Sequence, residues 1–108
     1  MAKAPIIAAS SLLKDTFRKR KLRLNKLVLF GSYARRRFRK DSDIDLIVVS
    51  RDFRKRSYNQ RIKIMEGINR MLVNALDKPV DLFYFSDEEW RRGHSLIIEE
   101  AKTSGKSI

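Results

Sequence analysis

The sequence contains no cysteine, which excludes disulfide bonds and metal sites built from thiolates. It also lacks any apolar run near the ~20 residues that a membrane-spanning helix requires; the run at residues 46–49 has only the length of a strand. The apolar residues 5–9 are followed by Lys14 and Asp15 rather than by a cleavage site, so we expect no signal peptide. These absences predict a cytoplasmic protein that makes no membrane contact.

Acidic residues are scarce compared with basic ones. Thirteen Asp and Glu residues face 25 Lys and Arg residues, which gives a net charge of +12. The basic residues concentrate at residues 18–23, 35–40 and 51–56. Such a charge attracts polyanions, including nucleotides, nucleic acid and acidic proteins, but a solvated basic surface would have the same composition. The charge therefore leaves nucleic acid open as a partner.

Helical and strand patterns alternate along the chain, and this predicts an α/β or α+β fold. The length of 108 residues fits one domain over residues 1–108. Gly67 lies inside one predicted helix, where it should lower stability by roughly 1 kcal/mol relative to alanine. The apolar residues of that helix, Ile62 and Met71 included, are expected in the core. The predicted strands are residues 26–30, 43–49 and 80–85; the predicted helices are residues 6–21, 33–39 and 57–76, a short helix after Ser86, and residues 95–104.

Three aspartates form the first candidate site. Asp43 and Asp45 are two residues apart at the start of a strand, so their side chains lie on the same face of the sheet. Two such carboxylates repel each other unless a cation lies between them, and their oxygens suit Mg²⁺. Asp81 is isolated in an apolar strand, and a position beside the pair would explain it. Three carboxylates could then hold two metal ions about 3.5–4 Å apart.

A Gly31-Ser32 turn follows the first predicted strand. Glycine permits close approach of the backbone to a phosphate, and free N–H groups at the start of a helix attract anions. The Ser32 hydroxyl can donate a hydrogen bond to a phosphate oxygen. If the first two strands are neighbours, this turn lies beside the aspartates.

Gly31-Ser32, ten further residues, and Asp43-Ile44-Asp45 resemble the signature of the DNA polymerase β-like nucleotidyltransferases, and most of all the minimal nucleotidyltransferase family. The resemblance covers residues 27–86 and includes the later strand with Asp81. It implies a small mixed sheet flanked by helices. Relatives often have Arg-Gly after the turn, whereas this chain has Arg35 followed by Arg36. This difference affects how the phosphates and the acceptor would be positioned after the turn, and it does not involve the metal ligands.

The resemblance also implies roles for individual residues. Asp43, Asp45 and Asp81 would be catalytic; Asp43 and Asp45 would bind both of two Mg²⁺ ions, and Asp81 would bind the catalytic one. Asp81 would in addition activate the acceptor hydroxyl. Gly31, Ser32 and Arg35 would bind the nucleotide.

Members of the minimal family often act in pairs with a helical HEPN protein. In toxin–antitoxin pairs the nucleotidyltransferase transfers AMP from ATP to a tyrosine of the HEPN toxin. The resemblance therefore implies transfer of NMP from an NTP, ATP being favoured, to a hydroxyl of a HEPN-type partner. A palm domain of 108 residues has little surface with which to grip a template, which also favours a protein acceptor.

Several alternatives stay open from the sequence alone. The chain could be a non-catalytic nucleotide-binding antitoxin, or a nucleotidyltransferase that acts on nucleic acid. A small-molecule acceptor and a homo-oligomer are also open. A calcium loop of the EF-hand type is disfavoured, because Leu46 stands where that loop requires glycine.

Overall fold

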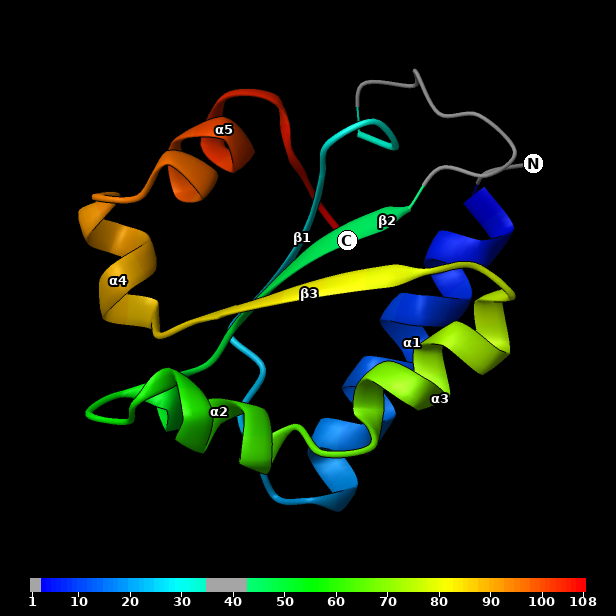
Figure 1. Cartoon of the computed structure of the whole chain (residues 1–108), viewed down its shortest axis with the longest axis horizontal. Helices are drawn as coiled ribbons and strands as arrows, with labels where there is room; N and C mark the ends of the chain where they lie inside the picture. Colours follow the sequence, from blue (N-terminus) through cyan, green and yellow to red (C-terminus); the bar gives the residue numbers. More distant parts are fainter. Residues whose placement is uncertain (1–2, 35–42) are drawn as a thin grey trace.

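A four-stranded mixed sheet forms the centre of the computed structural model, which describes residues 3–34 and 43–108 (Figure 1). The strand order is β3-β2-β1-β4. Strand β1 is antiparallel to both β2 and β4, whereas β2 and β3 are parallel. The strands are β1 (Lys26–Phe30), β2 (Ile44–Val49), β3 (Val80–Phe85) and β4 (Lys106–Ser107). The first three match the predicted strands, and the two-residue β4 was not predicted.

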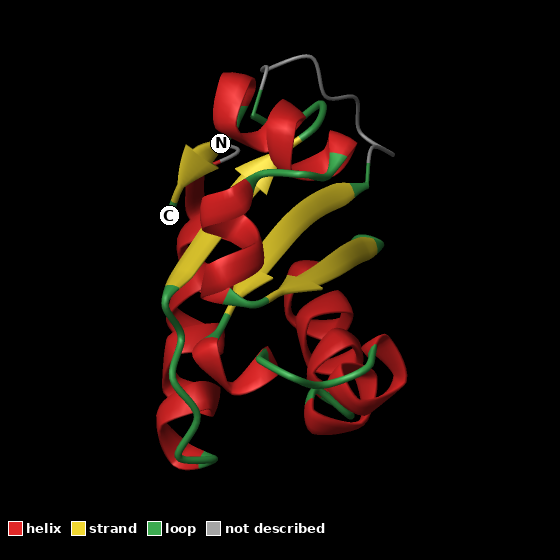
Figure 2. Cartoon of the chain, turned by 90° about the vertical axis from the view of Figure 1, so that its left-hand side faces the viewer, coloured by secondary structure: helices red, strands yellow, loops and turns green. Residues whose placement is uncertain are grey.

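Helices cover both faces of this sheet, as expected for a small mixed sheet flanked by helices (Figure 2). Leu29, Leu46 and Leu82 face the larger cluster, which α1 (Lys3–Lys19) and α3 (Ile68–Leu76) complete. On the other face Ile47 and Phe83 pack beneath α4 (Asp87–Arg92) and α5 (Leu96–Ser104). The alternation of β2 and β3 assigns Asp45 and Asp81 to this second face.

Several predicted helices are confirmed. Helix α1 begins slightly before the predicted start. A capping box of Ser86 and Glu89 opens α4, and Gly93 ends it. Helix α5 ends at Gly105 as predicted. The predicted helix over residues 33–39 lies largely outside the described residues; residues 31–34 form a turn. No helix within the described residues is long and apolar enough to cross a membrane.

The single helix predicted over residues 57–76 is wrong. The capping box of Ser57 and Gln60 opens α2 (Tyr58–Ile64), but Gly67 ends the continuity because its backbone is left-handed, with φ of 84°. Helix α3 then starts on a new axis. The rotated faces explain why Ile62 is 50% exposed and Met71 36% exposed, although both were expected in the core.

The geometry at Gly67 reverses the expected effect of an alanine. In a continuous helix Gly67→Ala would stabilise, but in a left-handed conformation it should destabilise by about 1–2 kcal/mol. The effect should come from the backbone alone, because the nearest atom to an added Cβ is an Arg20 side-chain nitrogen 3.9 Å away. Urea unfolding measures it. Gly67→Asn should lose less, since asparagine tolerates this conformation, and a stabilised alanine variant would contradict the break.

Candidate functional site

The parallel pairing of β2 and β3 brings two of the predicted aspartates together. Asp45 and Asp81 are direct register partners, so both side chains lie on the face covered by α4 and α5. Asp43 precedes β2 by one residue and is exposed. Asp45 is only partly exposed, and Asp81 is exposed. The site therefore lies at the edge of the sheet where β2 and β3 begin.

Asp45 has an unusual protonation equilibrium. Burial, the Asp81 carboxylate and the Asp43 carboxylate, in that order, raise the pKa of Asp45 to about 6. A hydrogen bond between the Asp45 and Asp81 side chains contributes in the same direction. Two carboxyl groups can share a hydrogen bond only when one of them keeps a proton. When both Asp45 and Asp81 are ionised, their negative charges repel each other, and no positive charge among the described residues compensates this repulsion.

The donor set has the chemistry of a hard-cation site. No group of three His, Cys, Asp or Glu side chains within residues 3–34 and 43–108 is arranged to hold a metal ion. However, two carboxylates that share a proton would also be neutralised by a divalent cation, and carboxylate oxygens are preferred ligands of Mg²⁺. The residues therefore fit a divalent cation, with Asp45 and Asp81 as the central pair and Asp43 beside them.

The Gly31 turn lies against the Asp45 carboxylate. Phe30 is the register partner of Asp45, and Gly31 follows with φ of 74°. A Cβ on Gly31 would be 3.3 Å from Asp45 Cγ and would overlap Asp45 Oδ2. The missing side chain is thus what allows the turn and the carboxylate to share this space. The predicted proximity of the turn and the aspartates is present in the structure.

The rest of the turn is anchored in the core. Tyr33 and Ala34 are 6% and 5% exposed and belong to the larger cluster. The Lys78 ammonium lies 5.8 Å from the centre of the Tyr33 ring. Ser32, between Gly31 and these buried residues, is half-buried. Arg35, the third predicted nucleotide-binding residue, lies outside the described residues.

The sequence reasoning missed one acidic residue near the site. The carboxylate of Glu100 on α5 also raises the pKa of Asp45. Glu100 is half-buried and lies directly before Ala101, which packs on the sheet. No signal in the sequence marks Glu100, because it comes near Asp45 only when α5 packs on the sheet.

Comparison with known proteins identifies the family. A model described as polymerase beta, nucleotidyltransferase, matches residues 12–108. The chain belongs to this nucleotidyltransferase family. The predicted resemblance is therefore confirmed, and the chain carries a nucleotidyltransferase domain with the family's polymerase β-like fold. No curated protein sequence matches the chain significantly.

Solved structures of related nucleotidyltransferases include toxin–antitoxin complexes. The chain is 26% identical to a chain of a toxin–antitoxin bound to AMP-PNP, with TM-score 0.63, covering 90% of this chain and 69% of that one. It is 27% identical to a chain in a complex of a tri-AMPylated Shewanella oneidensis HEPN toxin with an MNT antitoxin, with TM-score 0.61, covering 99% and 71%. A structure named as a minimal nucleotidyltransferase, 19% identical, shares the fold with TM-score 0.64 over 99% and 95% of the two chains.

Proposed function

We propose that this nucleotidyltransferase transfers AMP from ATP, with Mg²⁺, to a hydroxyl group of a HEPN-type protein, as the antitoxin of a toxin–antitoxin pair. The observation that carries the proposal is the register pairing of Asp45 with Asp81 beside the Gly31 turn. The relatives support the donor and the acceptor, since one was solved with AMP-PNP and another with an AMPylated HEPN toxin.

Each site residue has a role that follows from its position. Asp43, Asp45 and Asp81 would hold the Mg²⁺ ions, and the bound cations would stabilise negative charge on the phosphate oxygens. Gly31 allows the backbone of the turn to approach the triphosphate. The Ser32 hydroxyl would donate a hydrogen bond to a phosphate oxygen, and we propose that Arg35 contributes positive charge there.

The reaction is an in-line displacement at the α-phosphorus. The acceptor oxygen forms a bond to the α-phosphorus, and the bond from that phosphorus to the oxygen bridging to the β-phosphate breaks. Pyrophosphate leaves. Asp81, the most exposed member of the Asp45–Asp81 pair, takes the proton of the acceptor hydroxyl.

Two differently labelled forms of ATP test which bond is broken. Incubation with a HEPN protein and Mg²⁺ should transfer the α-phosphate label to the HEPN protein and leave the γ-phosphate label in pyrophosphate. Chelation of Mg²⁺ should stop the transfer. Asp43→Ala combined with Asp45→Ala should also stop it, because the ligand set is lost.

A measurement of toxin activity with the same double variant distinguishes a purely binding antitoxin. If the double variant neutralises the toxin as well as the unmodified chain does, neutralisation occurs by contact and the proposed antitoxin mechanism is wrong. Transfer of the γ-phosphate label would instead indicate a kinase and would equally contradict the proposal. Glu99→Gln, which changes an exposed charge on α5, is the matched control and should transfer label normally.

A further inference from the structure

A second charged region lies at the end of the sheet opposite the aspartates. Strand β1 begins there at Lys26 and β2 ends there at Val49, and these two residues pair across the sheet. Asp45 precedes Val49 by four positions, a separation of roughly 13 Å along an extended strand. In Figure 1 this end lies at the lower left, and the strand ends that carry the aspartates lie at the upper right. A ligand at this end therefore does not occupy the transfer site.

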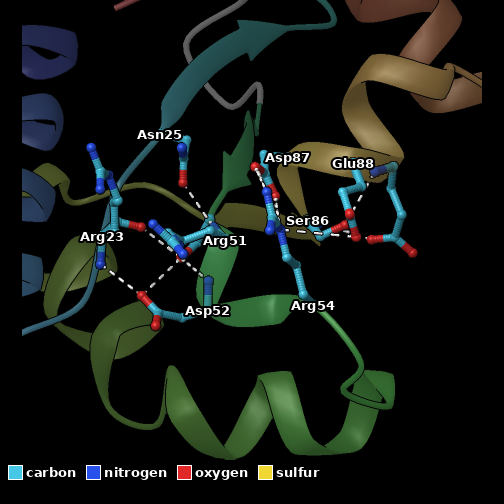
Figure 3. A network of polar contacts seen from close by, with 10 residues as sticks. Arg23, Asn25, Arg51, Asp52, Arg54, Ser86, Asp87 and Glu88 are labelled. Atoms are coloured by element: carbon cyan, nitrogen blue, oxygen red, sulfur yellow. Dashed lines mark hydrogen bonds and ion pairs between the residues drawn. The ribbon is translucent and has the colours of Figure 1, made fainter.

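The fold joins two basic segments at this end that are distant in the sequence (Figure 3). The Arg23 backbone N–H donates to Asp52 at 2.8 Å, and the Ser50 hydroxyl donates to the Arg23 carbonyl at 2.6 Å. The Arg51 backbone N–H donates to the Asn25 side chain at 2.7 Å. These bonds use the backbone of Arg23 and Arg51 and leave both guanidinium groups at the surface. Residues 23–25 and 50–52 are consequently held side by side, and the two basic segments meet there.

Asp52 lies within this surface, where its carboxylate accepts the Arg23 backbone N–H, and the acidic groups of α4 are paired with other cations. Arg54 Nε donates to Asp87 at 2.7 Å, and Arg61 Nη1 donates to Glu89 at 2.7 Å. Within the described part of the chain, the outermost basic side chains here form no ion pair. We call these exposed side chains the basic end; they are Arg23, Arg51, Lys55 and Arg56.

The basic end continues into a groove. A groove of about 450 Å³ between α1 and the start of β1 is lined by three cations, Lys14, Arg18 and Lys26. Asn25 also lines it, and its side chain is the acceptor for Arg51. Because Arg18 is ion-paired with Asp15, the groove extends the positive charge of the basic end mainly through Lys14 and Lys26.

An exposed aromatic ring lies beside the same surface. Tyr58, at the start of α2, follows Arg56 by two residues; one side of its ring packs against the Tyr84 ring, with 5.7 Å between the centroids, and the side chain is still 46% exposed. Cationic tracks with exposed rings are typical of proteins that bind single-stranded nucleic acid, in which phosphates contact the cations and bases stack on the rings. Three of the four basic-end residues are arginines, whose guanidinium groups match phosphate geometry better than lysine does.

We propose that the basic end binds the phosphate backbone of single-stranded nucleic acid, separately from nucleotide transfer. The variant Arg23→Gln, Arg51→Gln, Lys55→Gln and Arg56→Gln tests this with a labelled oligoribonucleotide of about 20 nucleotides, followed by fluorescence anisotropy. Affinity should fall by about 10-fold or more in ~50 mM salt, and the slope of log K against log salt should become shallower by up to ~3.

A charge-matched variant is the control. Arg70→Gln, Arg91→Gln, Arg92→Gln and Lys106→Gln removes the same number of exposed charges away from the basic end and should weaken binding by less than about 3-fold. Circular dichroism should show both variants folded. Because the basic end is remote from the aspartates, the first variant should keep its AMP transfer activity. If the unmodified chain and both variants all fail to transfer AMP, the proposed function is refuted and this inference is unaffected.

Three results would overturn the inference. The two variants could lose affinity equally, which would make net charge the only cause. Duplex RNA could bind more tightly than the single strand. Polyglutamate of equal charge could displace the oligonucleotide as well as unlabelled RNA does, which would indicate that an acidic protein is the partner of this surface.

Discussion

Asp45→Asn should abolish nucleotide transfer and, at the same time, stabilise the metal-free protein at pH 8. The loss of activity should be about 10³-fold or more, because the substitution removes a charged ligand from the centre of the proposed metal site. The gain in stability comes from removing the same negative charge when no cation is bound. Without a cation, Asp45 must ionise next to Asp81 and Asp43 while partly buried, and asparagine avoids that charge.

The sign of the pH dependence follows from the raised pKa. The folded protein keeps a proton on Asp45 up to about pH 6, whereas an unfolded aspartate loses it near 3.8. The folded state therefore binds more protons in this window, and the free energy of unfolding falls as the pH rises through it. The carboxyl group is partly open to solvent, so we expect an advantage of only about 1 kcal/mol for the asparagine variant at pH 8. At pH 4 the two proteins should be almost equally stable.

Urea unfolding at pH 4 and pH 8 in the presence of a chelator measures this difference. Adding Mg²⁺ at pH 8 should raise the melting temperature of the unmodified protein, because the ion binds only the folded state. It should raise that of Asp45→Asn much less. The control Glu99→Gln should respond to Mg²⁺ like the unmodified protein. An asparagine variant that is less stable at pH 8 would show that the Asp45 charge is compensated without a metal.

The strands could be predicted because they depend on local pattern, and the same pattern motivates the metal site that we propose. The apolar runs of β1 and β3 fix their position, and the spacing of Asp43 and Asp45 fixes their shared face. The register of Asp45 with Asp81 could not be derived in this way, because they are 36 positions apart and the pairing depends on how α2 and α3 cross over. The family resemblance indicated that the strand with Asp81 belongs to the same site as Asp43 and Asp45.

The errors have a common physical cause. Gly67 was predicted to lie inside a helix and to weaken it. Helix propensity alone does not distinguish such a glycine from one whose left-handed backbone redirects the chain. Strand β4 has only two residues, too few for a periodic signal, and is formed by pairing with β1. Glu100 reaches the electrostatic environment of Asp45 only because α5 packs on the sheet. In each case the local structure is set by tertiary packing and not by the local sequence pattern.

Gly31→Ala should reduce both stability and activity, because one atom would be added where the turn meets the Asp45 carboxylate of the proposed site. The left-handed backbone, with φ of 74°, should cost an alanine about 1–2 kcal/mol. The new Cβ would also overlap Asp45 Oδ2, so the carboxylate must move. A displacement of about 1 Å in a catalytic group can lower the rate about 10²-fold.

Two comparisons separate these contributions. Gly93→Ala meets a similar backbone penalty, with φ of 71°, but an added Cβ there has only the flexible Lys102 ammonium nearby, at 3.3 Å. It should lose stability and keep its activity. In an Asp45→Ala background the overlap disappears, so Gly31→Ala should then cost only the backbone term, about 1–2 kcal/mol. An equal loss of stability in both backgrounds would show that the turn and the carboxylate do not compete for space, and full activity in the single variant would show that Asp45 need not stay where it is.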